Sequence, residues 1–325
     1  MSSIFEKRIE IKPYEYPTAM GFVDAINNSY WLHSEWNYHS DIQDFNVKLD
    51  RIEKSAIKNT LLAIAQIEVS VKTFWGRIGD IFPKPEFASV GYTFAESEVR
   101  HERAYSNLLE VLNLNGDFKE LIEVPEIQGR IEYLTKYLKN ASSNNKEMYT
   151  LTLALFSLFV ENVSLFTQFS IVKSFNKHKN MLKDVDNVVQ ATQKEEQLHA
   201  MFGAYLLNEI KDQFPEWFNE EFYAKIKRAC KKAYKAELEI VKWIFKEGEL
   251  EYLPISCLDE FLKYRFNETL AMIKMEPVFE VKEDKLKSLD WFIEELVLQT
   301  QPDFFYKKSN NYSKNMQAVT SNDLF

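Results

Sequence analysis

Two short motifs with the same spacing, Glu98-x-x-His101 and Glu196-x-x-His199, each place a carboxylate and an imidazole one helical turn apart. On a helix, each pair falls on a face that is otherwise mostly apolar, where an unpaired carboxylate would be costly to bury. A divalent metal ion would neutralise the carboxylate and also accept the imidazole as a ligand. The two motifs therefore predict metal binding inside a helical core.

Two lone glutamates extend this pattern. Glu68 precedes the first motif and Glu161 precedes the second, each on an apolar helical stripe of its own. Two helices giving one Glu and two giving Glu-x-x-His form the ligand set of a dinuclear site in a four-helix bundle. Four carboxylates also balance the charge of two divalent ions. The predicted metal ligands are Glu68, Glu98, His101, Glu161, Glu196 and His199.

Long helical patterns that could position these ligands dominate the chain. Of its 325 residues 46% are hydrophobic, and only 8 are Gly and 9 Pro, which favours an all-α protein. We expect a single domain over 1–300 and a flexible tail over 301–325, where the sequence becomes polar and loses its core pattern. The stretch 30–47 reads as loop-like. The expected helices are 18–28, 48–79, 86–114, 117–140 with a break at Pro125, 146–172, 181–211, 215–246, 255–273 and 284–298.

Composition limits the compartment and the partners. The net charge of −9 argues against nucleic acid, and Cys230 and Cys257 lack a paired spacing, which favours a reducing compartment. We therefore expect a cytoplasmic protein. The apolar run 149–172 is long enough to be a membrane span, but Glu161 and Asn162 at its centre favour the core helix of a large bundle.

The chain from residue 30 to 325 resembles the small, radical-generating (beta) subunit of class I ribonucleotide reductase. Ser97-Glu98-x-x-His101-x-x-x-Tyr105 carries most of the resemblance, together with Glu161 and Glu195-Glu196-x-x-His199. The resemblance implies a ferritin-like helical bundle with a dinuclear metal site in its four-helix core and additional covering helices. It also implies ribonucleoside-diphosphate reductase activity, in which an oxidant made here is relayed to a catalytic (alpha) subunit that reduces ribonucleotides.

The resemblance assigns roles to four more residues. Tyr105 stands at the position of the radical tyrosine, and Trp31 resembles the tryptophan of the radical-transfer route. Glu195 stands where the family usually has an Asp that accepts a hydrogen bond from that tryptophan. Tyr312 resembles the relay tyrosine of the tail, and the end of the tail, 322–325, resembles the tip that docks on the alpha subunit. A homodimer and a flavoprotein activator are further implied partners.

Several alternatives stay open. The family usually has Asp where this chain has Glu68, so the metals are two iron ions, two manganese ions or a manganese/iron pair. The stored oxidant lies on Tyr105 or on the metals, and the activator is oxygen or a reduced oxygen species. A stand-alone ferritin-like di-metal oxidase would need the same six ligands but gives no reason for Tyr312. A non-catalytic iron-binding protein is the other alternative, although storage proteins are typically shorter chains.

Overall fold

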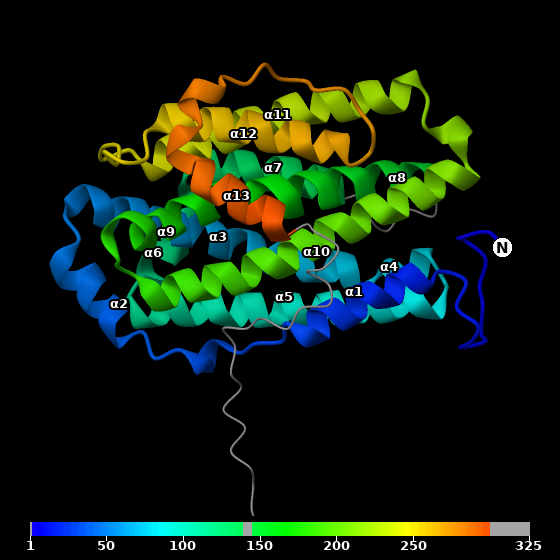
Figure 1. The fold of residues 1–325 in the computed structure, drawn as a ribbon, viewed down its shortest axis with the longest axis horizontal. Coiled ribbons are helices and arrows are strands. Elements are labelled where there is room, and N and C mark those ends of the chain that lie inside the picture. Colours follow the sequence, from blue (N-terminus) through cyan, green and yellow to red (C-terminus); the bar gives the residue numbers. More distant parts are fainter. Residues whose placement is uncertain (1, 139–144, 300–325) are drawn as a thin grey trace, which may run out of the picture.

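Four long helical segments form the centre of the molecule, shown by a computed structural model that describes residues 2–138 and 145–299 (Figure 1). All the regular elements in these residues are helices, which confirms the all-α prediction. The predicted tail, 301–325, with Tyr312 and the predicted docking tip 322–325, lies outside the described residues. The central segments are α3 (Arg51–Gly76), α5 (Pro85–Val111), the run α8 (Lys146–Leu155), η4 (Phe156–Ser164) and α9 (Phe166–Lys179), and α10 (Lys183–Gln213).

Shorter helices cover the two sides of this bundle. On one side, α1 (Pro17–Asn28) packs against α5 and α10. On the other side, α7 (Pro125–Leu138), α11 (Glu220–Ile244) and α12 (Ile255–Ala271) pack against η4 (Figure 1). The remaining helical elements are η1 (His33–Glu35), α2 (His39–Gln43), η2 (Asp44–Lys48), α4 (Ile78–Ile81), α6 (Asn115–Glu120), η3 (Leu121–Glu123), η5 (Pro215–Trp217), η6 (Glu283–Lys285), η7 (Lys287–Leu289) and α13 (Asp290–Gln299).

Local sequence signals set the ends of the helices that carry the site. The Asp50 side chain accepts a hydrogen bond from the Glu53 amide, and the Glu53 side chain accepts one from the Asp50 amide, so α3 begins with a capping box. Pro85 occupies the first turn of α5, where its missing amide proton costs nothing. Asn180, with φ of 55°, ends α9 in the left-handed conformation that Asn tolerates.

The stretch 30–47 differs from the loop that we expected. Residues 39–48 form α2 and the π-helical turn η2, and α3 then begins at Arg51 rather than at 48. Asp41 and Asp44 explain the difference, because both are buried and accept hydrogen bonds from the amides of Val185 and Leu182, at the start of α10. Carboxylates at a helix N-terminus are favourable, and these two fix the segment against α10.

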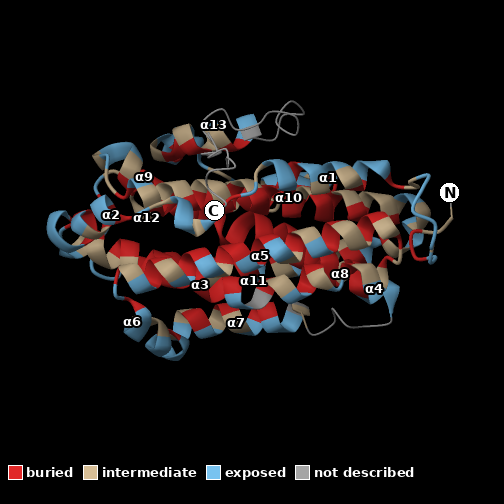
Figure 2. Cartoon of the chain, turned by 90° about the horizontal axis from the view of Figure 1, so that it is seen from below, coloured by how far each residue is buried: buried red, intermediate tan, exposed pale blue. Residues whose placement is uncertain are grey.

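The apolar run that also suited a membrane lies in the middle of the bundle. In the described part of the chain, Lys146–Lys179 is the one helical segment long and apolar enough to cross a membrane, and 94% of its apolar window is buried (Figure 2). It packs against α3, α10, α11 and α12, as a core helix should. It also continues to Lys179, beyond the expected end at 172, and contains the π-helical segment η4, which the sequence pattern did not predict.

Candidate metal centre

The structure brings all six predicted ligands together in the middle of the bundle. Glu68 comes from α3, Glu161 from η4, and the two Glu-x-x-His motifs from α5 and α10. All six side chains are fully buried. Helical periodicity therefore puts each predicted ligand on the inward face of its helix, and the packing of the four segments brings the six side chains together.

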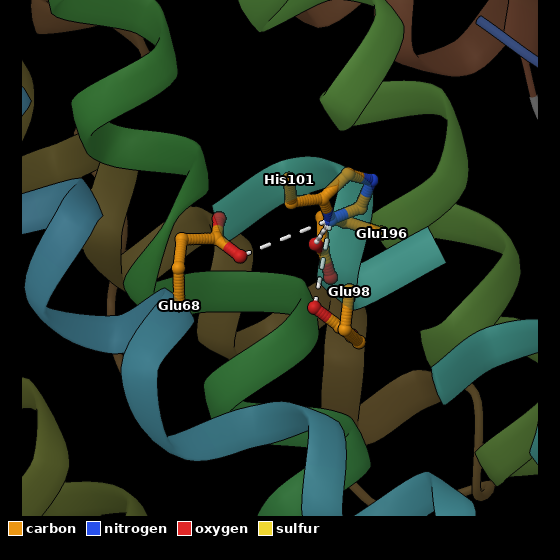
Figure 3. Close-up of side chains that lie close together, drawn as sticks. All are labelled: Glu68, Glu98, His101 and Glu196. Atoms are coloured by element: carbon orange, nitrogen blue, oxygen red, sulfur yellow. Dashed lines mark ion pairs between the residues drawn. The ribbon is translucent and has the colours of Figure 1, made fainter. Parts of the chain in front are cut away.

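One half of the cluster surrounds His101. Its Nδ1 atom lies 2.9 Å from Glu196 Oε1, 3.5 Å from Glu98 Oε2 and 3.9 Å from Glu68 Oε2 (Figure 3). The three carboxylates reach this nitrogen from three different helices. Atoms this close, all of ligand type, suit the coordination sphere of one metal ion.

The other half surrounds His199 in the same way. Its Nδ1 atom lies 3.0 Å from Glu98 Oε1, 3.3 Å from Glu196 Oε2 and 3.8 Å from Glu161 Oε2. Glu98 and Glu196 thus belong to both halves. In each of these carboxylates, one oxygen faces His101 and the other faces His199. Carboxylates shared in this way can bridge two ions, so the arrangement suits a dinuclear centre.

Unsatisfied ligand atoms provide a test of whether metal ions fit here. Both carboxylate oxygens of Glu68, Glu98 and Glu196, and one oxygen of Glu161, are buried without a hydrogen-bond partner of acceptable geometry. The same holds for the Nδ1 atoms of both histidines. Buried polar groups are almost always paired, and a set of orphaned oxygens and nitrogens around one point is what bound cations would satisfy. The residues therefore fit two divalent ions.

The remaining imidazole nitrogens are held from outside the cluster. His101 Nε2 lies 2.7 Å from Glu195 Oε2, and His199 Nε2 lies 3.0 Å from Ser97 Oγ. Such contacts fix the ring orientation and turn each Nδ1 inward, as metal-binding histidines require. Both partners directly precede a predicted ligand in the sequence, which is a signal that could have identified Ser97.

Charge crowding perturbs the pKa values of the cluster. Burial raises the pKa of Glu68 and of Glu161 well above the usual range, and the nearby negative charge of Glu196 raises both further. Burial alone would lower the pKa of His101 and His199, but the surrounding carboxylates outweigh it and raise both. Without metal ions, Glu68, Glu161 and both histidines therefore favour bound protons, which metal ions would displace.

Trp75 is a contact of the cluster that our sequence analysis missed. Its indole Nε1 donates a 2.8 Å hydrogen bond to Glu161 Oε1, which leaves Oε2 for the side that faces His199. Trp75 lies on the same helical stripe as Glu68 and is fully buried. A buried indole N–H usually finds an acceptor, so its position on that stripe was an available signal.

Tyr105 lies one helical turn beyond His101, on the same face of α5. Its hydroxyl is buried and has no hydrogen-bond partner of acceptable geometry. Burial raises the pKa of Tyr105 well above its usual value, the charge of Glu68 raises it further, and the Thr192 hydroxyl opposes them. The phenol is therefore held neutral, close to the Glu68 side of the cluster.

Trp31 stacks on His101, with ring centroids 5.9 Å apart and an interplanar angle of 18°. Its indole Nε1 has no hydrogen-bond partner, so the structure does not show the bond to Glu195 that the family pattern suggests. Glu195 instead accepts from Arg100 Nη1 at 3.0 Å and meets His101 on its other oxygen. Arg100, which the sequence analysis did not single out, is therefore the donor that Glu195 meets in place of the expected tryptophan.

Comparison with known proteins places this geometry in a family. The family model for the ribonucleotide reductase small chain matches residues 8–286. The protein named probable ribonucleoside-diphosphate reductase small subunit 048L, from Invertebrate iridescent virus 3, is 24% identical over 94% of this chain and 85% of its own length.

Solved structures show the same fold. The R2 subunit of Clostridium botulinum ribonucleotide reductase superposes with a TM-score of 0.78, at 15% identity, over 89% of this chain and 90% of that one. The dimanganese(II)-NrdF of Streptococcus sanguinis gives 0.68 at 15% identity, over 91% and 99%. With the family model spanning most of the sequence and the ferritin-like fold shared, this chain belongs to the ribonucleotide reductase small-chain family.

Proposed function

We propose that this protein is the radical-generating subunit of a ribonucleoside-diphosphate reductase, with a dinuclear metal centre held by the six ligands. The observation that carries the proposal is the pair of shared carboxylates, Glu98 and Glu196, each with one oxygen toward either histidine. A site for a single metal ion would need carboxylate oxygens beside only one of the two histidines. The metals are two iron ions, two manganese ions or a manganese/iron pair.

The bound metals would supply one-electron oxidation by oxygen or a reduced oxygen species, a chemistry that no ordinary side chain performs. Glu68 and His101 would hold one ion, Glu161 and His199 the other. The surrounding burial excludes water and protects a strong oxidant from side reactions. The substrate ribonucleotide would be reduced on the alpha subunit and not in this chain.

Tyr105 is the side chain best placed to store the oxidising equivalent. Its buried phenol lies one helical turn beyond the ligand His101, and its pKa is raised by burial, so it is neutral before oxidation. If the oxidant stays on the metals instead, Tyr105 is a buried phenol near the cluster with no role in storage.

Trp31 would carry the oxidising equivalent outward from His101, on which it stacks. Trp36 follows it toward the surface, with ring centroids 5.5 Å apart. Glu195 and Arg100 would fix His101 at the start of this route. Tyr312 would continue the relay, and the tip 322–325 would dock on the alpha subunit. A homodimer, a flavoprotein activator and a cytoplasmic location complete the proposal.

Metal loading in air tests the proposal directly. Full-length protein loaded with iron, manganese or both should bind two ions per chain and support ribonucleotide reduction with its alpha subunit. A chain that binds fewer than two ions, or that never supports reduction with any loading, would contradict it. Direct oxidation of a small molecule without the alpha subunit would favour the stand-alone oxidase.

Tyr105→Phe separates the two places for the oxidant. If Tyr105 holds the radical, the variant should keep its metals and lose both the phenoxyl signal in electron paramagnetic resonance and the activity. Tyr149→Phe is the matched control, because Tyr149 is an equally buried tyrosine on α8 with no ligand role. Activity that survives in Tyr105→Phe with a metal-centred signal assigns the oxidant to the metals.

A further inference from the structure

A buried cation outside the metal cluster faces the segment that carries Glu161. Arg265, on α12, is only 6% exposed, and its burial lowers the pKa to about 10, so it stays protonated at neutral pH. Among the residues that the structure describes, no carboxylate lies within ion-pair distance of its guanidinium. Burying a charge without a counter-ion is costly, so the contacts of the guanidinium must offset its loss of hydration.

Among the described residues, the hydrogen bonds and the ring contact of the Arg265 guanidinium lie within or just after η4. Its Nε and Nη2 atoms donate to the Asn162 carbonyl oxygen at 3.2 Å and 2.8 Å, and Nη2 also donates to Asn162 Oδ1. The guanidinium carbon lies 4.4 Å from the centre of the Phe166 ring. One arginine is therefore directed at one turn of one helix.

That turn is where the backbone needs additional donors. A π-helix such as η4 pairs carbonyls with amides five residues ahead, and pairing four residues ahead resumes where the Phe169 amide donates to the Leu165 carbonyl. A change of register leaves a carbonyl without its usual amide, and an unpaired buried carbonyl is destabilising. The Asn162 carbonyl, which receives two donors from Arg265, lies at this change of register.

The Asn162 side chain is bound to the same covering helix. Its Nδ2 atom donates to Thr269 Oγ1 at 2.6 Å, while Oδ1 accepts from Arg265. With Asn162 held toward α12, the preceding residue, Glu161, points into the bundle. There Trp75 takes one of its oxygens and His199 lies 3.8 Å from the other.

We propose that Arg265, acting through Asn162, is a positioning residue that keeps η4 in π-helical register and so directs Glu161 at His199. This inference rests on the proposed dinuclear function. It assigns α12 a specific part in assembling the Glu161 half of the centre. The Glu68 half, whose ligands come from α3, α5 and α10, does not depend on it.

The test is a manganese titration of full-length, metal-free Arg265→Met, with free Mn(II) followed by electron paramagnetic resonance. We expect one ion bound with the wild-type dissociation constant and a second bound roughly 10- to 100-fold more weakly, the usual loss when support of a ligand is removed. Amide hydrogen exchange over residues 156–164 should accelerate. Arg265→Lys keeps the charge and one donor direction. Its affinity for the second ion should lie between those of the wild type and Arg265→Met.

Asn267→Ala is the matched control. Asn267 lies on the same helix but bonds to Val278 and Phe279, away from η4. Both ions should therefore bind this variant with their wild-type dissociation constants, even if its free energy of unfolding falls. Should Arg265→Met not fold, Thr269→Val removes the shorter of the two hydrogen bonds that Asn162 Nδ2 donates, the other going to Met272 Sδ, with little change of shape. The inference would be overturned if the Arg265 or Thr269 variant bound both ions with the wild-type dissociation constants. It would also be overturned if both ions lost affinity by the same factor. Wild-type protein that binds fewer than two ions would refute the proposed function instead.

Discussion

Gly203 offers a quantitative test of how closely α10 approaches the segment that carries Glu161. It lies one turn after His199, and a Cβ atom placed on it would overlap both Cβ and Oγ of Ser157, well inside the 3.0 Å that real Cβ contacts respect. Ser157 itself lies one turn before Glu161. We predict that Gly203→Ala pushes α10 and η4 apart beside the cluster.

Two opposing terms set the expected change in the free energy of unfolding. Overpacking a core typically costs about 1–3 kcal/mol. Alanine in a helix interior favours folding by about 1 kcal/mol over glycine. The single variant should therefore lose up to about 2 kcal/mol in stability. Gly21→Ala, on α1, is the control for propensity alone, because nothing lies within 4 Å of the added methyl group, and it should gain stability.

A double-mutant cycle isolates the steric term. Ser157→Gly removes the overlapping side chain, together with its hydrogen bond to the Leu153 carbonyl. Combined with Gly203→Ala, it should restore the room that the methyl group needs, so urea unfolding of metal-free protein should show a favourable coupling of about 1–3 kcal/mol. A coupling below about 0.5 kcal/mol, the limit for independent sites, would refute the close approach.

Trp75→Phe should weaken metal binding roughly 10- to 100-fold at the Glu161 half of the centre, as measured by manganese titration, because it removes the donor to that carboxylate. Metal-free protein should lose thermal stability as pH rises above 6.5, because the raised pKa values of His101 and His199 favour the folded state only while these groups are protonated. Metal-loaded protein should melt higher and lack this decline, since its ligands must be deprotonated. Deleting 313–325 should abolish binding to the alpha subunit in a pull-down assay while metal content stays at the wild-type level; unchanged binding would remove the tail from the proposal.

The ligand-bearing stripes could be predicted because they depend on helical periodicity alone. Phe94, Glu98, His101, Tyr105 and Leu108 are all buried, as their spacing predicted. Once four such stripes must face one core, their polar members have to meet. No knowledge of loop geometry is needed for that result.

The support around the ligands could not be predicted in the same way, because it crosses between elements far apart in sequence. The partner of Glu161 is Trp75, and the partner of Asn162 is Arg265. We infer that the π-helical register of η4 likewise depends on donors from α12, and nothing in the apolar run itself indicates hydrogen bonds between residues five apart. The observed helix bounds also differ from the predicted ones where a buried carboxylate caps a neighbouring helix, as Asp41 does for α10.

The orphaned oxygens at the centre have a consequence for the protein's abundance. A chain made without metal keeps four acidic side chains buried in its core, and most of their carboxylate oxygens lack a hydrogen-bond partner. Ions that bind only the folded state raise its population by mass action. Cells degrade transiently unfolded chains, so small differences in stability change steady-state levels several-fold. The number of these subunits in a cell should therefore follow its supply of manganese or iron even when synthesis is constant.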